Sequence, residues 1–180
     1  MAYWRMQLHP DDSPEALRHS VESLGAGYIG LDFATDAGDL MRIEQSALPV
    51  NERQYWSFAH KMTGGDNVLI LVHHFPFALV TIAGHENGDY NYIRRRAPEI
   101  GVWFRHFRRI EKPVKYYSDF VKDSAKHQRI EMYDTIQPLI DPNGRSYQLM
   151  EEWLAASANR IPVRVEGSSF ISPQLAVVGG

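Results

Sequence analysis

Residues 66–83 read DNVLILVHHFPFALVTIA and contain two apolar runs rich in branched side chains. The runs cover residues 66–72 and 77–83, and the segment His73 to Pro76 separates them. Short runs that stay apolar without alternation are typical of strands that are covered on both faces. We therefore expect two adjacent buried strands at the centre of the fold.

Weaker patterns on either side of this stretch complete the prediction of fold class. Residues 3–8 alternate large apolar with polar side chains, and residues 28–31 form another short apolar run. Leu17, Val21 and Leu24 share one helical face, and residues 55–62 show similar spacing. This order of elements predicts an α+β fold, with a curved or barrel-like mixed β-sheet surrounded by helices.

The segment from Gly101 to Ile110 alternates apolar and basic side chains, which predicts a long strand. Val102, Phe104 and His106 would then point to one side of it. Beyond this strand we expect helices at residues 116–128, 131–139 and 146–158, followed by weakly extended chain. No linker or repeat divides the 180 residues, so we expect a single domain with residues 120–180 as a helical and extended C-terminal elaboration.

The composition narrows the cellular setting and the chemistry. The chain has no cysteine, which excludes disulfides, thiolate metal sites and cysteine nucleophiles. Its longest apolar run is Val68 to Val72, which is too short to span a bilayer, and its first residues do not resemble a signal peptide. We therefore expect a cytoplasmic protein without a membrane partner.

Positive charge is concentrated in one segment of an otherwise mildly acidic chain. The formal net charge is −3, yet residues 91–115 hold six arginines and two lysines against two glutamates. A localised basic stretch of this kind is typical of a face that contacts phosphates. The alternative is an ordinary charged edge facing solvent. The candidate phosphate-binding residues are Arg94, Arg95, Arg96, Arg105, Arg108 and Arg109.

An enzymatic function has less support from the residues. His73 and His74 are adjacent, so on a strand they would point to opposite faces, and no grouping places two metal ligands on one surface. Serine elbows, phosphate loops and dinucleotide fingerprints are absent from the sequence. We expect no catalytic residues, no metal and no cofactor. A metal-dependent hydrolase or nuclease that uses His73 or His74 remains open as an alternative.

Several short segments occur together in an order that resembles the EVE/YTH-like branch of the PUA superfamily. They span roughly residues 3–120 and read YWRM at 3–6, GYIGLDF at 27–33, GDL at 38–40, FAHKMTGGDNVLI at 58–70, VTIAG at 80–84 and YNY at 90–92, followed by an arginine-rich stretch leading to Val102 and Trp103. The chain is most similar to the N-terminal domains of McrB-type modification-dependent restriction proteins. It departs from them where Leu31, Asp32 and Phe33 replace their usual Gly-Trp pair.

The resemblance implies a small barrel that takes a flipped, modified base into an aromatic cage. It predicts a reader of methylated or hydroxymethylated DNA, with a separate nuclease or motor as a possible partner; modified RNA is the alternative ligand. Aromatic rings can stack on a base, although core packing is their ordinary role. A carboxylate can accept a hydrogen bond from an exocyclic amine on the edge of a base, although capping a loop is the alternative role for Asp32. The candidate base-binding residues are Trp4, Asp32, Phe33, Trp56, Tyr92 and Trp103.

Overall fold

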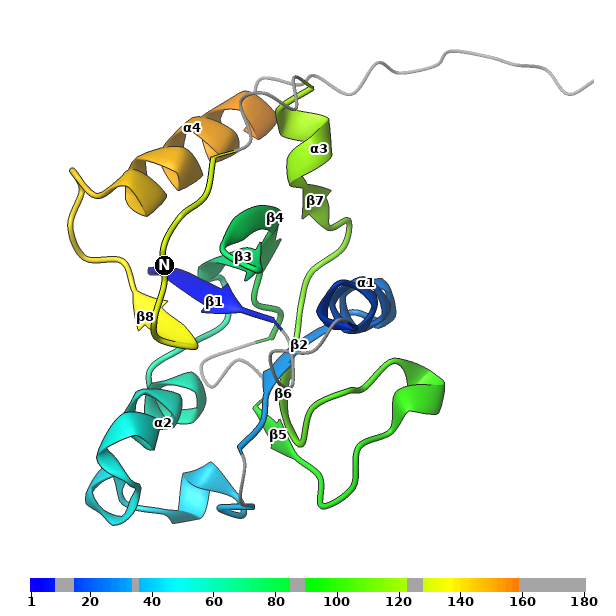
Figure 1. Ribbon diagram of the computed structural model, residues 1–180, viewed down its shortest axis with the longest axis vertical. Helices are drawn as coiled ribbons and strands as arrows, with labels where there is room; N and C mark the ends of the chain where they lie inside the picture. The colour runs from blue at the N-terminus through cyan, green and yellow to red at the C-terminus, as the bar shows by residue number, and fades with distance from the viewer. Residues whose placement is uncertain (9–14, 34–35, 85–89, 123–127, 159–180) are drawn as a thin grey trace, which may run out of the picture.

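The computed structural model describes residues 1–8, 15–33, 36–84, 90–122 and 128–158, which form a mixed α+β fold (Figure 1). No helix within these ranges is long and apolar enough to cross a bilayer. The strands are β1 (Tyr3–Gln7), β2 (Tyr28–Leu31), β3 (Asn67–Val72), β4 (Phe75–Thr81), β5 (Asn91–Tyr92), β6 (His106–Arg109), β7 (Lys115–Tyr116) and β8 (Ile136–Pro138). The α-helices are α1 (Ala16–Ala26), α2 (Arg53–His60), α3 (Tyr117–Phe120) and α4 (Arg145–Ala158), and short 3₁₀ turns are η1 (Leu40–Arg42), η2 (Gln45–Ala47), η3 (Val50–Glu52) and η4 (Pro98–Ile100).

The hairpin of β3 and β4 lies inside a five-stranded sheet with the order β7-β4-β3-β1-β8. Strand β3 pairs antiparallel with β4 and parallel with β1, so both of its edges are occupied. His73 and His74 form the turn between β3 and β4 with φ angles of 48° and 69°. Two successive left-handed residues suit the twist of a tight hairpin. The expected pair of central strands is confirmed.

Both faces of the five-stranded sheet are buried, as the continuous apolar pattern predicts. Val68 and Ile70 belong to one core cluster, which also includes Trp4 and residues of α1 and α2. Leu69 and Leu71 belong to a second cluster with residues of α3 and α4. Figure 1 shows α3 and α4 on one side of this sheet and α2 on the other. Alternate side chains of β3 therefore enter two separate cores.

A smaller sheet with the order β2-β6-β5 positions the basic segment. Gly30 of β2 lies so close to the next strand that a Cβ atom there would be 2.5 Å from Cβ of Phe104 and 2.6 Å from the carbonyl oxygen of His106. An isolated bridge between Ile82 and Ile110 links the two sheets. The described strands thus form two sheets and no closed barrel; the broader prediction of a mixed α+β fold is confirmed.

The C-terminal half differs most from the sequence prediction. A helix over residues 131–139 is wrong, because Ile136–Pro138 form β8 and pair antiparallel with β1. Met132 and Ile136 have helical spacing, but the free edge of β1 needs hydrogen-bond partners, and tertiary pairing overrides the local pattern. Of the helix expected at 116–128, Tyr117–Phe120 form α3 and residues 123–127 lie outside the described residues; α4 confirms the helix expected at 146–158. The extended segments expected after residue 160 lie outside the described residues.

Candidate functional site

Aromatic side chains from three parts of the chain gather around His106 at one end of the smaller sheet. The ring of Phe33 meets that of His106 edge-on at 4.8 Å, and the ring of Tyr92 lies 5.1 Å away. Tyr55 packs edge-on against Phe33 at 4.7 Å, and the Tyr90 hydroxyl lies 2.8 Å from Nδ1 of His106. We call these five residues the His106 cluster.

The hydrogen bonds of Tyr90 indicate where His106 carries its proton. The Tyr90 hydroxyl oxygen accepts the backbone N–H of Leu40 at 3.1 Å, which leaves its own proton free to be donated to Nδ1 of His106. Burial raises the pKa of Tyr90, so the hydroxyl keeps that proton. Burial also lowers the pKa of His106 to about 4, so the imidazole is neutral near pH 7. Its remaining proton is then on Nε2.

Nε2 of His106 is buried and has no hydrogen-bond partner among the residues that the structure describes. A buried donor without an acceptor costs about 1–3 kcal/mol, so such groups are rare and call for an explanation. At this position the N–H can donate to a carbonyl oxygen or a ring nitrogen of a ligand.

Asp32 holds two arginines beside this cluster. Its side chain is 1% exposed, and it accepts from Nε of Arg96 at 2.8 Å and from Nε of Arg105 at 2.6 Å. Arg105 also donates to the backbone oxygen of Phe33 at 2.8 Å. Both guanidiniums pair with the same buried carboxylate, which offsets the cost of burying its charge. The expectation that Asp32 reads the edge of a base is therefore corrected: its carboxylate positions Arg96 and Arg105.

Tyr92, one of the half-buried rings of the cluster, forms a hydrogen bond with an acidic side chain. Its hydroxyl donates to Oδ2 of Asp36 at 2.7 Å. This hydrogen bond lowers the pKa of Asp36 and raises the pKa of Tyr92. The nearest guanidinium nitrogen of Arg105 is 3.5 Å from Oδ2 of Asp36. The rim of the cluster is thus a network of alternating charge that a ligand could rearrange.

The six candidate phosphate-binding arginines fall into three groups. Arg108 is fully buried and donates to the backbone oxygens of Phe58 and Ala59 at 2.7 and 3.0 Å. It does not reach a phosphate, which corrects the prediction. Arg96 and Arg105 are held by Asp32. The third group is exposed and forms no ion pair with the described residues: Arg94, Arg95 and Arg109.

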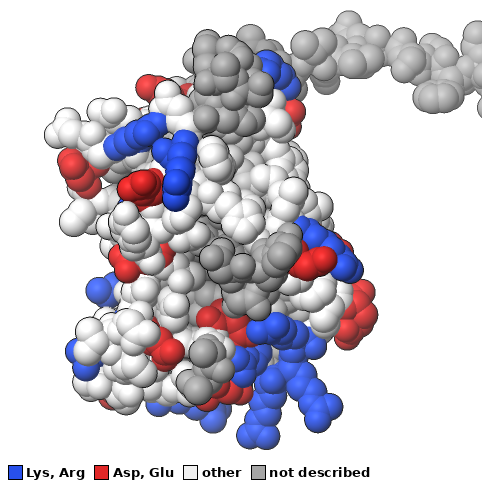
Figure 2. All heavy atoms as spheres, in the orientation of Figure 1, with Lys and Arg blue, Asp and Glu red and all other residues white. Residues whose placement is uncertain are grey.

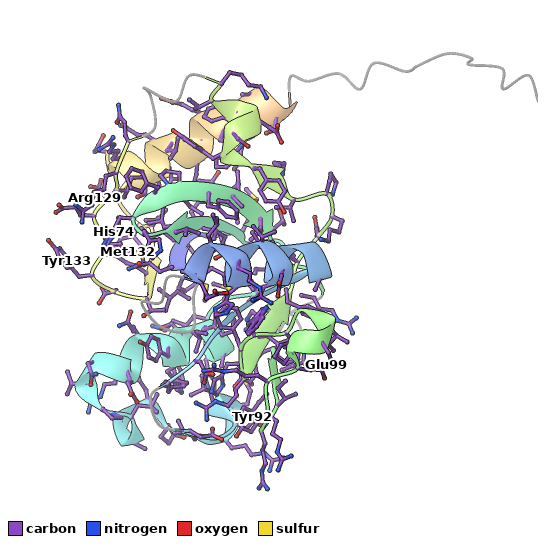
Figure 3. All side chains as sticks on the ribbon, turned by 45° about the vertical axis from the view of Figure 1, so that its right-hand side comes forward. His74, Tyr92, Glu99, Arg129, Met132 and Tyr133 are labelled. Atoms are coloured by element: carbon purple, nitrogen blue, oxygen red, sulfur yellow. The ribbon has the colours of Figure 1, made fainter. Side chains whose placement is uncertain are left out.

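The basic side chains gather at one end of the molecule. Figure 2 shows most of the clustered Lys and Arg atoms at the end where β5 lies in Figure 1. Tyr92, at the end of β5, is labelled at the same end in Figure 3. Arg94 and Arg95 follow it by two and three positions. Arg94 and Arg95 therefore lie close to Tyr92 of the His106 cluster.

The three tryptophans among the candidates do not join this cluster. Trp4 is 3% exposed and donates its indole N–H to Asp66 at 3.1 Å, so it is a core residue and not the wall of a pocket. Trp103 stacks on His19 with ring centroids 4.0 Å apart, and Trp56 stacks on His60 at 3.9 Å. The expected cage of Trp4, Phe33 and Trp103 is not formed. Of the predicted rings, Phe33 and Tyr92 both contact His106.

Three members of the cluster were not among the predicted base-binding residues: Tyr55, Tyr90 and His106. A signal for His106 was present, because alternation placed it on the same side as Val102 and Phe104, and the structure buries that side. No local pattern connects Tyr55, on α2, with residues of the smaller sheet.

The histidine pair considered for a metal site has a structural role. His73 and His74 occupy the turn between β3 and β4, and Nδ1 of His74 accepts the backbone N–H of Met132 at 3.3 Å. Figure 3 shows His74 beside Met132. Within the described ranges, no three histidine, aspartate or glutamate side chains are grouped so that they could hold a metal ion.

Comparison of the chain with models of known protein families and with curated proteins found no match. A function for this chain has to be inferred from its own residues. The strongest feature is the His106 cluster with the arginines beside it, because a buried, unpaired donor, partly exposed rings and unpaired positive charge lie together there.

Proposed function

We propose that the protein binds nucleic acid at the His106 cluster and its adjoining arginines, and that it reads a modified base in DNA. The observation that carries this proposal is the position of Arg94 and Arg95. Both are exposed, neither forms an ion pair with a described residue, and both directly follow the strand that supplies Tyr92. The chain as a whole is acidic, so this positive charge is local.

Arginines without acidic partners are suited to phosphates. A guanidinium that is not already neutralised can donate two parallel hydrogen bonds to phosphate oxygens. Such contacts position a strand without reading its sequence. Arg96 and Arg105 serve a different purpose, because their ion pairs with Asp32 tie the basic segment to the end of β2.

Base recognition would come from the rings and from the free N–H. Stacking on an aromatic ring contributes about 1–3 kcal/mol per base. In this proposal Tyr92 moves outward from His106, which gives a flipped base access to Nε2 and to the ring of Phe33. The N–H of His106 then donates to the base. That bond recovers the cost of a donor that is otherwise unpaired, and it helps to offset the unstacking of the base.

The choice of a modified base in DNA is supported by the sequence resemblance to EVE/YTH-like domains of the PUA superfamily. A PUA-like curved sheet is part of the same proposal, with the five-stranded and three-stranded sheets as its two halves. McrB-type proteins carry related domains, so a separate nuclease or motor acting with this chain fits the proposal.

The test is a binding titration by fluorescence anisotropy with short oligonucleotides. The set contains one DNA sequence unmodified, with one methylated adenine, and with one methylated or hydroxymethylated cytosine, together with matched RNA. We expect the tightest binding to one modified DNA. Equal affinity for all the DNA ligands would exclude recognition of a modified base. Tighter binding to the matched RNA would show that RNA is the ligand, since the 2′-hydroxyl is the main local difference between the two.

The double variant Arg94→Gln/Arg95→Gln tests the phosphate contacts. We expect weaker binding to every ligand. In a plot of log K against log salt concentration, the magnitude of the slope should fall by about 1 for each phosphate that the variant no longer binds. Arg42→Gln is the matched control, because Arg42 is exposed on η1 and its partner is Asp39. Binding by the double variant equal to that of the control would contradict the proposed interface.

A further inference from the structure

A second positively charged site lies on the opposite side of the molecule. A cavity of about 420 Å³ lies between β1, β8 and the start of α4, and three arginines line it: Arg5, Arg129 and Arg145. Figure 3 labels Arg129 on the side opposite to Tyr92. A volume of this size suits a small organic ligand. The cavity is therefore separate from the interface described above.

Arg5 forms no ion pair within 4 Å among the described residues, and the one acid that acts on its pKa is Asp134, through a longer-range interaction. Its Nε and Nη2 donate to Oε1 of Gln137 at 2.9 and 2.5 Å, and its Nη1 donates to the backbone oxygen of Glu131 at 3.4 Å and to Oγ of Ser146 at 3.3 Å. All these acceptors are uncharged. Burial lowers the pKa of Arg5, but a guanidinium stays charged at neutral pH. Partly buried charges are normally paired directly, and no carboxylate of a described residue lies within ion-pair distance of this guanidinium.

The other two arginines add unpaired charge at the rim. Nη1 of Arg145 donates to the backbone oxygen of Arg129 at 3.4 Å, which brings these two residues to the same side of the cavity. No ion pair within the described residues involves Arg5, Arg129 or Arg145. The two acids of the lining bind elsewhere: Glu131 accepts from Tyr133 at 3.3 Å, and Asp141 accepts the backbone N–H of Asn143 at 3.0 Å.

We propose that this cavity binds the phosphate group of a small phosphate monoester, of about the size of a mononucleotide. Three guanidiniums around one cavity match the several oxygens of a phosphate better than the two of a carboxylate. Buried Ile130 and half-buried Leu139 line the same cavity and supply apolar contact for the rest of the ligand. This site is additional to the nucleic-acid interface and does not depend on it.

The test is isothermal titration calorimetry of the full chain with inorganic phosphate, AMP and adenosine. We expect saturable binding of AMP, weaker binding of phosphate, and no binding of adenosine. Arg129→Gln/Arg145→Gln should weaken AMP binding about tenfold or more, since a hydrogen bond to a charged group is worth that factor. Both side chains are exposed, so the variant should fold; Arg42→Gln is again the control.

The outcomes separate this site from the nucleic-acid interface. AMP binding that is retained by Arg94→Gln/Arg95→Gln but weakened about tenfold or more by Arg129→Gln/Arg145→Gln supports the cavity, whatever the oligonucleotides show. The reverse pattern would place the phosphate at Arg94 and Arg95 and overturn the assignment. Equal binding of adenosine and AMP, or no saturable binding of AMP, would also overturn it.

Discussion

Replacing Arg108 by methionine should destabilise the protein without removing any of the exposed arginines of the proposed nucleic-acid interface. The guanidinium satisfies the backbone oxygens of Phe58 and Ala59 near the end of α2 and lies 5.5 Å from the ring centre of Phe58. Each carbonyl left unpaired in the core costs about 1–3 kcal/mol. Removing a desolvated charge returns part of that cost. We expect a net loss of about 2–4 kcal/mol in the free energy of unfolding.

Urea denaturation at pH 7 measures this loss directly. Arg109→Gln is the matched control, because Arg109 is the next residue on β6 and is exposed, and it should change stability by less than about 0.5 kcal/mol. Folded Arg108→Met should bind oligonucleotides like the wild type. An unfolding free energy equal to that of the control would refute the structural role of Arg108. So would a folded variant whose affinity drops as far as that of Arg94→Gln/Arg95→Gln.

Two further predictions concern the smaller sheet. Gly30→Ala should lower the free energy of unfolding by about 1–3 kcal/mol, because the new Cβ overlaps Phe104 and the backbone of His106. Gly25→Ala is the control: the new Cβ has nothing within 4 Å, so this variant should be neutral or stabilising. Similar melting temperatures for the two variants would contradict this packing. The pKa of His106 is about 4 in the folded chain and 6.5 in an unperturbed histidine, so the unfolded chain binds the proton first as pH falls. Stability is therefore highest above pH 6.5 and declines as pH drops towards 4, by about 2 kcal/mol between pH 7 and pH 5. Urea denaturation at these two pH values should show a smaller decline for His106→Gln than for the wild type; equal declines would rule out His106 as the titrating group.

Local patterns in the sequence were sufficient for the central part of the fold. The apolar run at 66–83 predicted the β3–β4 hairpin and its burial on both faces, because uninterrupted hydrophobicity reflects what covers each side of a strand. The same kind of pattern failed at residues 131–139. Helical spacing there was overridden by pairing with β1, a segment more than 100 residues earlier in the chain.

The sequence by itself determined that positive charge is concentrated between residues 91 and 115, and alternation placed His106 on the same side of that segment as Val102 and Phe104. Only the tertiary structure decided what that charge can do. The six arginines are alike in sequence, but Asp32 neutralises Arg96 and Arg105, and backbone carbonyl oxygens bind Arg108. The other three, Arg94, Arg95 and Arg109, have no acidic partner among the described residues. It also decided that Trp4 enters the core while Tyr55 and Tyr90 join His106. Periodicity reports which side of an element is buried; the partner a side chain meets depends on how distant elements pack.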